Sequence, residues 1–410
     1  MLRLFILLTV IISQLHLLRN VTPLYALVYA SSVCLTFLIA SLTATRMEYG
    51  SRRILGMILG LYGIPILAIL PGLVSGAPYT SGSLALGTVR LIFTIPIYVV
   101  VLWLPGTQSN LRALTVTAAL FSVLAALTIP YQFVAGPISW FAESSERAGL
   151  FRFASLFGSL TTLGAVCGMG MILCVYSIRP ASLASIAVIC IAVGSMLSLS
   201  KGAIVNVALA LLVLPLVRRP TKRHLVVLLG LLTIGFLGAF AQWAGKLSVF
   251  WRAFRLTDQS ATRIYDDVSL AQSILDRLTA LPRLAIAFHG KFTLLLGLGP
   301  IGGAGNLGYP EVPTPHNGLV ELLLMGGVPL SLWYLWLNER AFRAGIARAS
   351  TPEVRGEAVV GLYILGSMFL NMMFGSGILF SPAGALFFAI GLKLVSPGLS
   401  TVRRAEPSLD

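Results

Sequence analysis

Long apolar segments follow one another along the chain, and shorter segments that hold most of the charged residues separate them. A helix needs about 20 mainly apolar residues to cross the roughly 30 Å hydrocarbon core of a bilayer. The apolar residues do not alternate with polar ones, as they do in the strands of membrane β-barrels. The pattern therefore predicts an all-α, polytopic membrane protein with about 12 transmembrane helices.

The predicted spans differ in how clearly they are separated. The first resembles a signal peptide, but it lacks a small-residue cleavage site, so we interpret it as a membrane span. The seventh and eighth are divided only by Ser200, Lys201 and Gly202. The spans are placed near residues 4–18, 24–43, 54–74, 84–104, 112–134, 155–176, 182–198, 202–217, 224–243, 317–337, 357–373 and 378–394.

Basic residues in alternate loops predict the orientation. Loops rich in Lys and Arg stay in the cytoplasm, and twelve spans with both termini cytoplasmic put all of these loops on that side. They hold Arg46, Arg52, Arg53, Arg112, Arg179, Arg218, Arg219, Lys222, Arg223, Arg340, Arg343, Arg348, Arg355, Lys393, Arg403 and Arg404. The chain then divides into spans one to nine at 1–243, a large outer loop at 244–316, spans ten to twelve at 317–394 and a cytoplasmic tail at 395–410.

Composition agrees with a membrane location. Of the 410 residues, 57% are hydrophobic and 10% are charged, whereas a soluble domain has roughly 25% charged residues. The net charge of +15 could suggest nucleic acid, but the cations lie in short loops beside apolar spans, which favours membrane lipid and no nucleic acid. The four cysteines lie within apolar segments and form no metal motif, so we interpret them as small buried apolar residues. No carboxylate cluster resembles a metal site either, and neither a metal nor a cofactor is expected.

The outer loop at 244–316 is long for a connection between membrane helices, and such loops are usually functional. Ile264, Val268 and Leu275 recur at helical spacing in its middle. We expect an amphipathic helix there, which lies on the outer membrane surface or caps a cavity.

Several cations depart from the rule that basic residues stay inside. A group of outward-facing Arg and Lys residues suits a lipid-linked phosphate or diphosphate, since Arg binds phosphate oxygens with a planar fork and Lys as a point charge. Two alternatives remain: the loop arginines can pair with loop carboxylates, and Arg90 and Lys201 can reach the lipid headgroups. The candidates are Arg90, Arg147, Arg152, Lys201, Arg263, Arg277 and Arg283.

A Gly-rich stretch that begins at Gly297 and Gly299 leads through several prolines to His316 and Asn317, which open an apolar helix. The glycines form no phosphate loop, because no Gly-Lys-Ser/Thr follows them, and by themselves they are compatible with a flexible turn. His316 at the outer membrane boundary can act as a general base near neutral pH. The alternative is a capping role, with Asn317 as the N-cap.

The segment Gly297–Gly327 resembles the pattern of the O-antigen ligase and O-antigen polymerase superfamily: a Gly-x-Gly turn, then His-Asn, then an apolar helix with Glu and Gly-Gly. Weaker similarities precede it in the expected order. Residues Glu146–Phe151 resemble the family's Arg-x-Gly-x-Phe, and Ser198–Ala203 resemble its Ser-x-Ser-Arg-Gly-Ala, with Lys201 in place of Arg. Arg277 resembles the arginine that precedes the Gly-x-Gly turn. The aromatic residue that usually follows this arginine is missing, and Lys201 lacks the fork geometry of Arg.

The resemblance implies a metal-independent membrane glycosyltransferase on the periplasmic face of the bacterial inner membrane. The donor would be a glycan on undecaprenyl diphosphate, and the acceptor a lipid A-core sugar for a ligase or a lipid-linked glycan for a polymerase; the His-Asn context favours the ligase. His316 and Arg277 would be catalytic, and Lys201, Arg147 and Arg152 would bind diphosphate. Arg90, Arg263 and Arg283 would add to the diphosphate site, and Asn317, Gly297 and Gly299 would support it.

Two other readings compete with a transferase. A secondary transporter also has twelve spans, and the interruptions of apolar segments at Gly63-Ile64-Pro65 and at Pro96 are compatible with it. Transporters, however, hold polar groups near the middle of the bilayer, whereas the charges of this chain lie near the ends of its spans. The third reading is a scaffold without catalytic activity.

Overall fold

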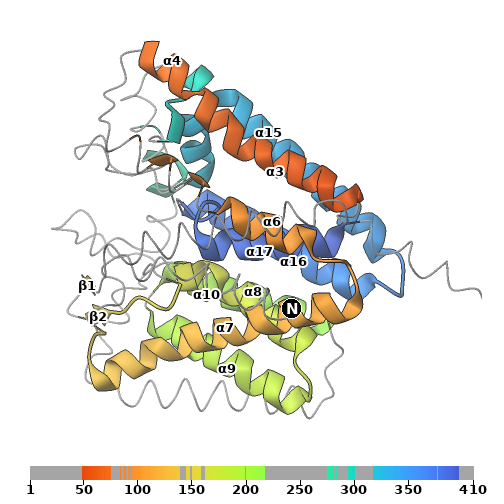
Figure 1. Cartoon of the computed structure of the whole chain (residues 1–410). Helices are drawn as coiled ribbons and strands as arrows, with labels where there is room; N and C mark the ends of the chain where they lie inside the picture. The colour runs from red at the N-terminus through yellow and green to blue at the C-terminus, as the bar shows by residue number, and fades with distance from the viewer. Residues whose placement is uncertain are drawn as a thin grey trace, which may run out of the picture.

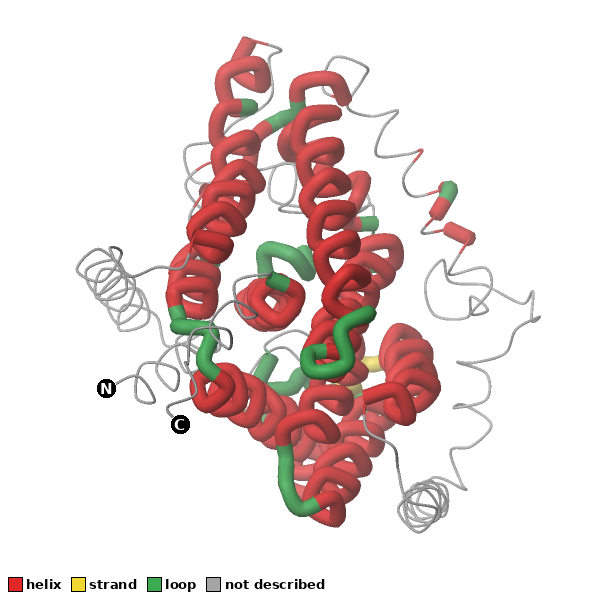
Figure 2. Tube along the Cα trace, turned by 90° about the vertical axis from the view of Figure 1, so that its right-hand side faces the viewer, coloured by secondary structure: helices red, strands yellow, loops and turns green. Residues whose placement is uncertain are grey.

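The computed structural model describes residues 49–74, 84, 87–88, 91–92, 94–138, 145–147, 150–157, 162–198, 200–217, 275–276, 278–280, 283, 294–300, 317–375 and 377–396. This part of the chain is helical apart from one short hairpin, drawn in yellow in Figure 2. The predicted helical class is therefore confirmed for the described residues. A two-stranded hairpin, which was not predicted, is also present.

The helices lie where the apolar segments predict them. The elements are α3 (Tyr49–Leu67), α4 (Ile69–Val74), α6 (Ile95–Trp103), α7 (Gln108–Ala135), β1 (Ser145–Arg147), β2 (Leu150–Arg152), α8 (Thr162–Ser177), α9 (Ala181–Leu197), α10 (Lys201–Val217), α15 (Gly318–Ala349), α16 (Arg355–Phe374) and α17 (Pro382–Val395). The predicted spans at 4–18, 24–43 and 224–243 lie outside the described residues, and each of the others overlaps one of these helices.

Within the described residues, four helical segments are long and apolar enough to cross a membrane: Gly50–Val74, which comprises most of α3 and α4, and Gln108–Ala135, Gly318–Ala349 and Arg355–Met373. Shorter apolar helices accompany them at Thr162–Ser177, Ala181–Leu197, Val205–Val217 and Pro382–Val395. Twelve crossings and their orientation stay a prediction.

The described bundle exposes apolar side chains and buries polar ones. Leu67, Leu124 and Leu332 are exposed on α3, α7 and α15, whereas Asn206 and Asn371 are buried between helices. In water this distribution would be unfavourable. In lipid it is expected, because apolar side chains can face the acyl chains while polar groups need partners inside the protein.

The helices form a layered bundle (Figure 1). α3 lies against α15 along one edge, and α7 lies against α9 along the opposite edge. Between them, α6 packs on α17, α17 on α16, and α8 on α10 and α16. Helix α16 thus touches α15 on one side and α8 and α10 on the other.

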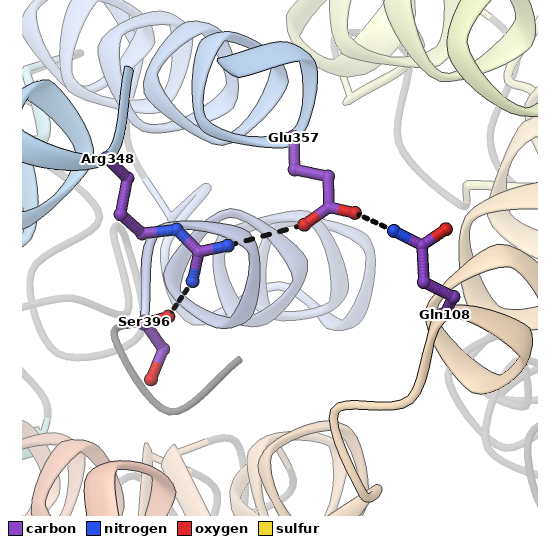
Figure 3. A network of polar contacts seen from close by, with 4 residues as sticks. All are labelled: Gln108, Arg348, Glu357 and Ser396. Atoms are coloured by element: carbon purple, nitrogen blue, oxygen red, sulfur yellow. Dashed lines mark hydrogen bonds and ion pairs between the residues drawn. The ribbon is translucent and has the colours of Figure 1, made fainter. Parts of the chain in front are cut away.

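Charged side chains tie several helices together at one end of the bundle (Figure 3). Arg348 donates to the carbonyl oxygen of Ser396 and lies 3.3 Å from Glu357 Oε2, while Gln108 Nε2 donates to Glu357 Oε1 at 2.8 Å. The network joins α15, α16, α7 and the residue that follows α17. Lys393 of α17 donates nearby to Ser51 Oγ of α3, at 2.7 Å.

These contacts lie among helix ends that are predicted, from the basic residues in the loops, to face the cytoplasm. The starts of α3, α7 and α16 meet the ends of α15 and α17 there. The sequence predicts Arg348 in a cytoplasmic loop and Lys393 in the cytoplasmic tail, but both side chains are buried, at 7% and 1% exposure. The opposite end of the bundle, where α10 and α15 begin, contains the sequence motifs of interest.

Candidate functional site at the starts of α10 and α15

The hairpin follows α7 and carries two of the candidate cations. Its register pairs Ser145 with Arg152 and Arg147 with Leu150. Residues two apart on a strand share a face, so Arg147 and Arg152 occupy positions on one face of the hairpin. The sequence motif Glu146–Phe151 thus coincides with a β-hairpin. The apolar pattern of the sequence predicts helices and does not indicate these short strands.

A buried amide anchors the base of this hairpin to α7. Gln132 is 2% exposed. Its Nε2 donates to the carbonyl oxygen of Ala154 at 2.9 Å, and its Oε1 accepts from the backbone N–H of Ile138 at 3.5 Å. Phe153 packs edge-on against Phe133, with ring centroids 5.0 Å apart. Both ends of the segment that contains the hairpin are therefore held against the end of α7.

Helix α10 begins at Lys201, within the Ser-x-Ser-Lys-Gly sequence. The two serines shape the turn before it: Ser198 Oγ donates to Ser195 O at 2.6 Å and accepts from the N–H of Ser200 at 3.4 Å. Ser200 is buried against Gly164 of α8, where a Cβ would overlap its hydroxyl. The turn is thus held by α8, and it presents Lys201 as the first residue of the helix.

Close packing of α8 on α10 depends on two glycines that sequence reasoning did not single out. Gly164 faces Ser200 and Ala203, and Gly168 faces the backbone oxygen of Asn206. Their spacing is Gly-x-x-x-Gly in an apolar helix, a common motif of closely packed membrane helices. This spacing is the signal that could have predicted the contact.

Helix α15 begins with the cap that the sequence allowed as an alternative. Asn317 Oδ1 accepts from the N–H groups of Leu319 and Val320, at 3.0 Å and 3.3 Å. Gly318 lies directly against Met372 and the backbone oxygen of Gly375. Glu321, buried in the first turn, accepts from the N–H of Gly377. The start of α15 is therefore joined to the end of α16 and the turn that follows it.

Helix α16 also contacts α10 near its start. Asn371, next to Met372, exchanges hydrogen bonds with Asn206 of α10 at 3.0 Å and 3.1 Å. Asn206 lies five residues after Lys201. The last turns of α16 thus lie between α10 and the start of α15 and contact both helices. The tertiary structure brings together two motifs that are more than 100 residues apart in the sequence.

The Gly-x-Gly segment is a structural element rather than a flexible turn. Gly297 and Gly299 have φ angles of 84° and 76°, which side chains other than glycine rarely adopt. A Cβ on Gly297 would lie 2.6 Å from the Cα of Gly326 in α15. The segment therefore needs glycine both for its conformation and for its close backbone contact with α15.

This contact lies at a break in α15. Gly327 has φ 64° and ψ −162°, so the helix is interrupted there. Beside the interruption, the N–H of Leu298 donates to the carbonyl oxygen of Leu324 at 2.7 Å. Gly299 on the same segment lies against Ile69 at the start of α4. The Gly-x-Gly segment thus supports the helix of the His-Asn motif.

The remaining predicted residues are only partly placed. For Lys201, Arg147 and Arg152 the backbone is described. Arg283 is exposed, in a short helical stretch where its N–H donates to Thr279 O at 3.1 Å. That stretch agrees with part of the amphipathic helix that the sequence predicts in the middle of the outer loop, near residues 260–290. The predicted site residues Arg90, Arg263, Arg277 and His316 lie outside the described residues.

The described residues form a helical protein with helices able to cross a membrane. Two helices, α10 and α15, begin at sequence motifs, and both pack against the last turns of α16. No model of a known protein family matches the chain, and no curated protein sequence matches it.

Proposed function

We propose that the chain is a membrane glycosyltransferase of the O-antigen ligase type, with twelve spans, cytoplasmic termini and a periplasmic active site. One observation supports this more than any other. The second turn of α10, at Asn206, and the first residue of α15, Gly318, lie against the same last turns of α16. These are the two helices at whose starts the resemblance expects a diphosphate-binding cation, Lys201, and a general base, His316.

The reaction needs charge stabilisation and one proton transfer. The acceptor oxygen forms a bond to the anomeric carbon of the glycan, while the bond from that carbon to the diphosphate oxygen breaks. The electron pair leaves with the undecaprenyl diphosphate, and the acceptor hydroxyl gives its proton to His316. Fixed cations beside the departing diphosphate usually contribute the largest part of such catalysis, and the base contributes about 10²–10⁴-fold.

The cations have distinct places in this proposal. Lys201 stands at the N-terminus of α10, where the helix dipole also favours a negative group. Arg147 and Arg152 share one face of the hairpin, whose base is held at the end of α7. Arg277 would bring a fork of donors from the outer loop, with Arg90, Arg263 and Arg283 as further candidates.

The proposal predicts transfer without a metal ion, since several cations can neutralise the diphosphate. Purified protein should keep its activity in EDTA. A strict requirement for Mg²⁺ or Mn²⁺ would contradict this part of the mechanism.

The decisive variant is His316→Ala in cells that lack the chromosomal copy, scored by the lipopolysaccharide ladder. We expect loss of the ladder at normal protein level, because the acceptor hydroxyl loses its base. His289→Ala, in the same outer loop but outside the motif, is the matched control and should restore the ladder. Full activity of His316→Ala would remove the centre of the mechanism, and it is the result that a scaffold without catalytic activity predicts.

The same deletion strain distinguishes ligase from polymerase. Without a ligase, the core carries no O-antigen and lipid-linked polymer accumulates. Without a polymerase, the core carries a single repeat. We favour the ligase, because the His-Asn motif stands in a ligase-like context with one long outer loop late in the chain.

A secondary transporter remains the second candidate because α15 is broken, as helices of transporters often are. In such transporters the break exposes backbone groups to the substrate. Here the N–H of Leu298 donates a hydrogen bond to the carbonyl oxygen of Leu324, and Ile64 and Leu330 lie against Gly326. A break filled by backbone and apolar side chains supports a structural role and favours the transferase.

A further inference from the structure

Two buried asparagines join α10, whose start belongs to the candidate site, to the last turns of α16. Asn206 of α10 and Asn371 of α16 are 2% and 8% exposed. Asn206 Nδ2 donates to Asn371 Oδ1 at 3.0 Å, and Asn371 Nδ2 donates to Asn206 Oδ1 at 3.1 Å. Each amide thus serves the other as both donor and acceptor.

The same network includes α8 and a further residue of α16. Asn206 Nδ2 also donates to the carbonyl oxygen of Gly164, and Asn371 Nδ2 to that of Ala165, both at 3.0 Å. Ser367 Oγ donates to Asn206 Oδ1 at 3.1 Å. One buried polar cluster therefore joins α8, α10 and α16.

This cluster permits only one register between the helices. Sliding α10 by one turn, about 5.4 Å, would separate its donors from their acceptors. Each amide would keep only its bond to a carbonyl of its own helix, Gly202 O or Ser367 O, and losing the bonds between helices in an apolar interior is unfavourable. A polar residue at an apolar helix interface is known to specify register in coiled coils, and the same reasoning applies here.

The register of α10 and α16 determines the spacing of the candidate site. Lys201 lies five residues before Asn206, or roughly 7.5 Å along the helix. On the other side of α16, Met372 contacts Gly318 at the start of α15. The asparagine pair lies where α16 separates α10 from α15, about one and a half turns from the start of α10 and next to the residue that contacts the start of α15.

We propose that Asn206 and Asn371 are positioning residues, which hold Lys201 and the start of α15 at the spacing that one lipid diphosphate requires. The inference rests on the proposed function, because it assigns a role within that reaction. Neither amide needs to touch the reacting atoms, since the pair acts through α10 and α16. A misplacement of about 1 Å can lower a catalysed rate about 100-fold, so the register should affect kcat. Binding of the apolar lipid tail should change little.

The test uses the full-length protein in detergent with Asn206→Leu, Asn371→Leu and the double variant. The donor is lipid-linked O-antigen extracted from a strain that lacks the chain, and the acceptor is core lipopolysaccharide. Each single variant breaks both hydrogen bonds between the two amides and should lower Tm, whereas the double variant replaces both amides by apolar side chains and should recover Tm. We expect the double variant to keep KM for the donor within about twofold while kcat falls about tenfold or more.

The matched control is Asn338→Leu. Asn338 is a buried amide of α15, 3% exposed, and its Nδ2 donates to Tyr334 O within the same helix at 2.9 Å. The control should have wild-type kcat. A double variant with recovered Tm and wild-type kcat would overturn the positioning role and leave the proposed function intact. A wild-type protein without transfer activity would overturn the proposed function, and the positioning role with it.

A milder variant covers the case in which the double variant cannot be purified. Ser367→Ala removes the Oγ bond to Asn206 Oδ1 and leaves the amide pair in place. Its kcat should fall, but by less than that of the double variant, because the amide pair still joins α10 to α16. A kcat equal to that of the wild type would contradict the proposal.

Discussion

Arg348 and Glu357 are buried against each other at the end of the bundle opposite the candidate site. Both are 7% exposed, and Gln108 and Ser396 supply further hydrogen bonds to them. Removing one partner of such a pair leaves an uncompensated buried charge, whereas an exposed pair contributes little. The contribution of these charges to stability therefore depends on their burial.

At this scale we expect Glu357→Gln to lower the free energy of unfolding by about 3–5 kcal/mol, because Arg348 would keep its charge without a carboxylate. Thermal or chemical unfolding in detergent measures the change. The control is Glu339→Gln, which removes an exposed partner of Arg343 and should cost at most about 1 kcal/mol. Equal losses for both variants would contradict the buried ion pair.

Local capping and long-range pairing differ in how well the sequence predicts them. Asn317 directly precedes the apolar helix that it caps, so its role follows from neighbouring residues. Asn206 and Asn371 are 165 residues apart, and within its own helix each is only a polar residue in an apolar segment. Their pairing depends on which helices become neighbours, and a periodic pattern does not contain that information.

At the scale of elements, α15 is longer than the predicted span at 317–337 and is broken about a third of the way along, at Gly326 and Gly327. It continues to Ala349, and its second half carries a Glu339–Arg343 pair and Arg340 stacked 5.7 Å from the Trp336 ring centroid. Apolar length alone ends the span at the first charged residues, whereas the helix continues through them by i,i+4 pairing.

The break predicts the effect of Gly327→Ala. Its φ of 64° is unfavourable for alanine, and a Cβ would collide with the backbone oxygen of Leu295. We expect a loss of about 2–4 kcal/mol in unfolding free energy, from backbone strain and overpacking together. Unfolding in detergent tests this.

Gly56→Ala is the control for this variant. Gly56 lies within α3, and nothing lies within 4 Å of a Cβ placed there. Alanine should stabilise this helix by up to about 1 kcal/mol. If both glycine variants had the same stability, the break in α15 would not need glycine.

At the scale of the whole molecule, the two ends of the bundle differ in character. One end holds the buried ion pair and Lys393, and the other holds the hairpin, the start of α10 and the start of α15. Helix α7 connects them with 28 residues, about 42 Å, which exceeds the roughly 30 Å hydrocarbon core.

The proposed orientation predicts labelling from opposite sides of the membrane. Pro137→Cys, after the end of α7, should react with a membrane-impermeant maleimide in intact spheroplasts, and Ser109→Cys, at its start, only after permeabilisation. Both positions are exposed, and the wild-type chain is the control for native cysteines such as the buried Cys167 and Cys174. The reverse pattern would put the candidate site in the cytoplasm and contradict the proposed function.

The sequence by itself determined the helical class and the approximate positions of the described helices, because apolarity and length belong to contiguous residues. It also indicated the residues at which α10 and α15 begin. Only the tertiary structure decided that these two helices pack against the last turns of α16, that Gly297 fits against the break at Gly327, and that Arg348 is buried. These contacts join residues far apart in the chain, and close packing and the pairing of polar groups in an apolar interior select them.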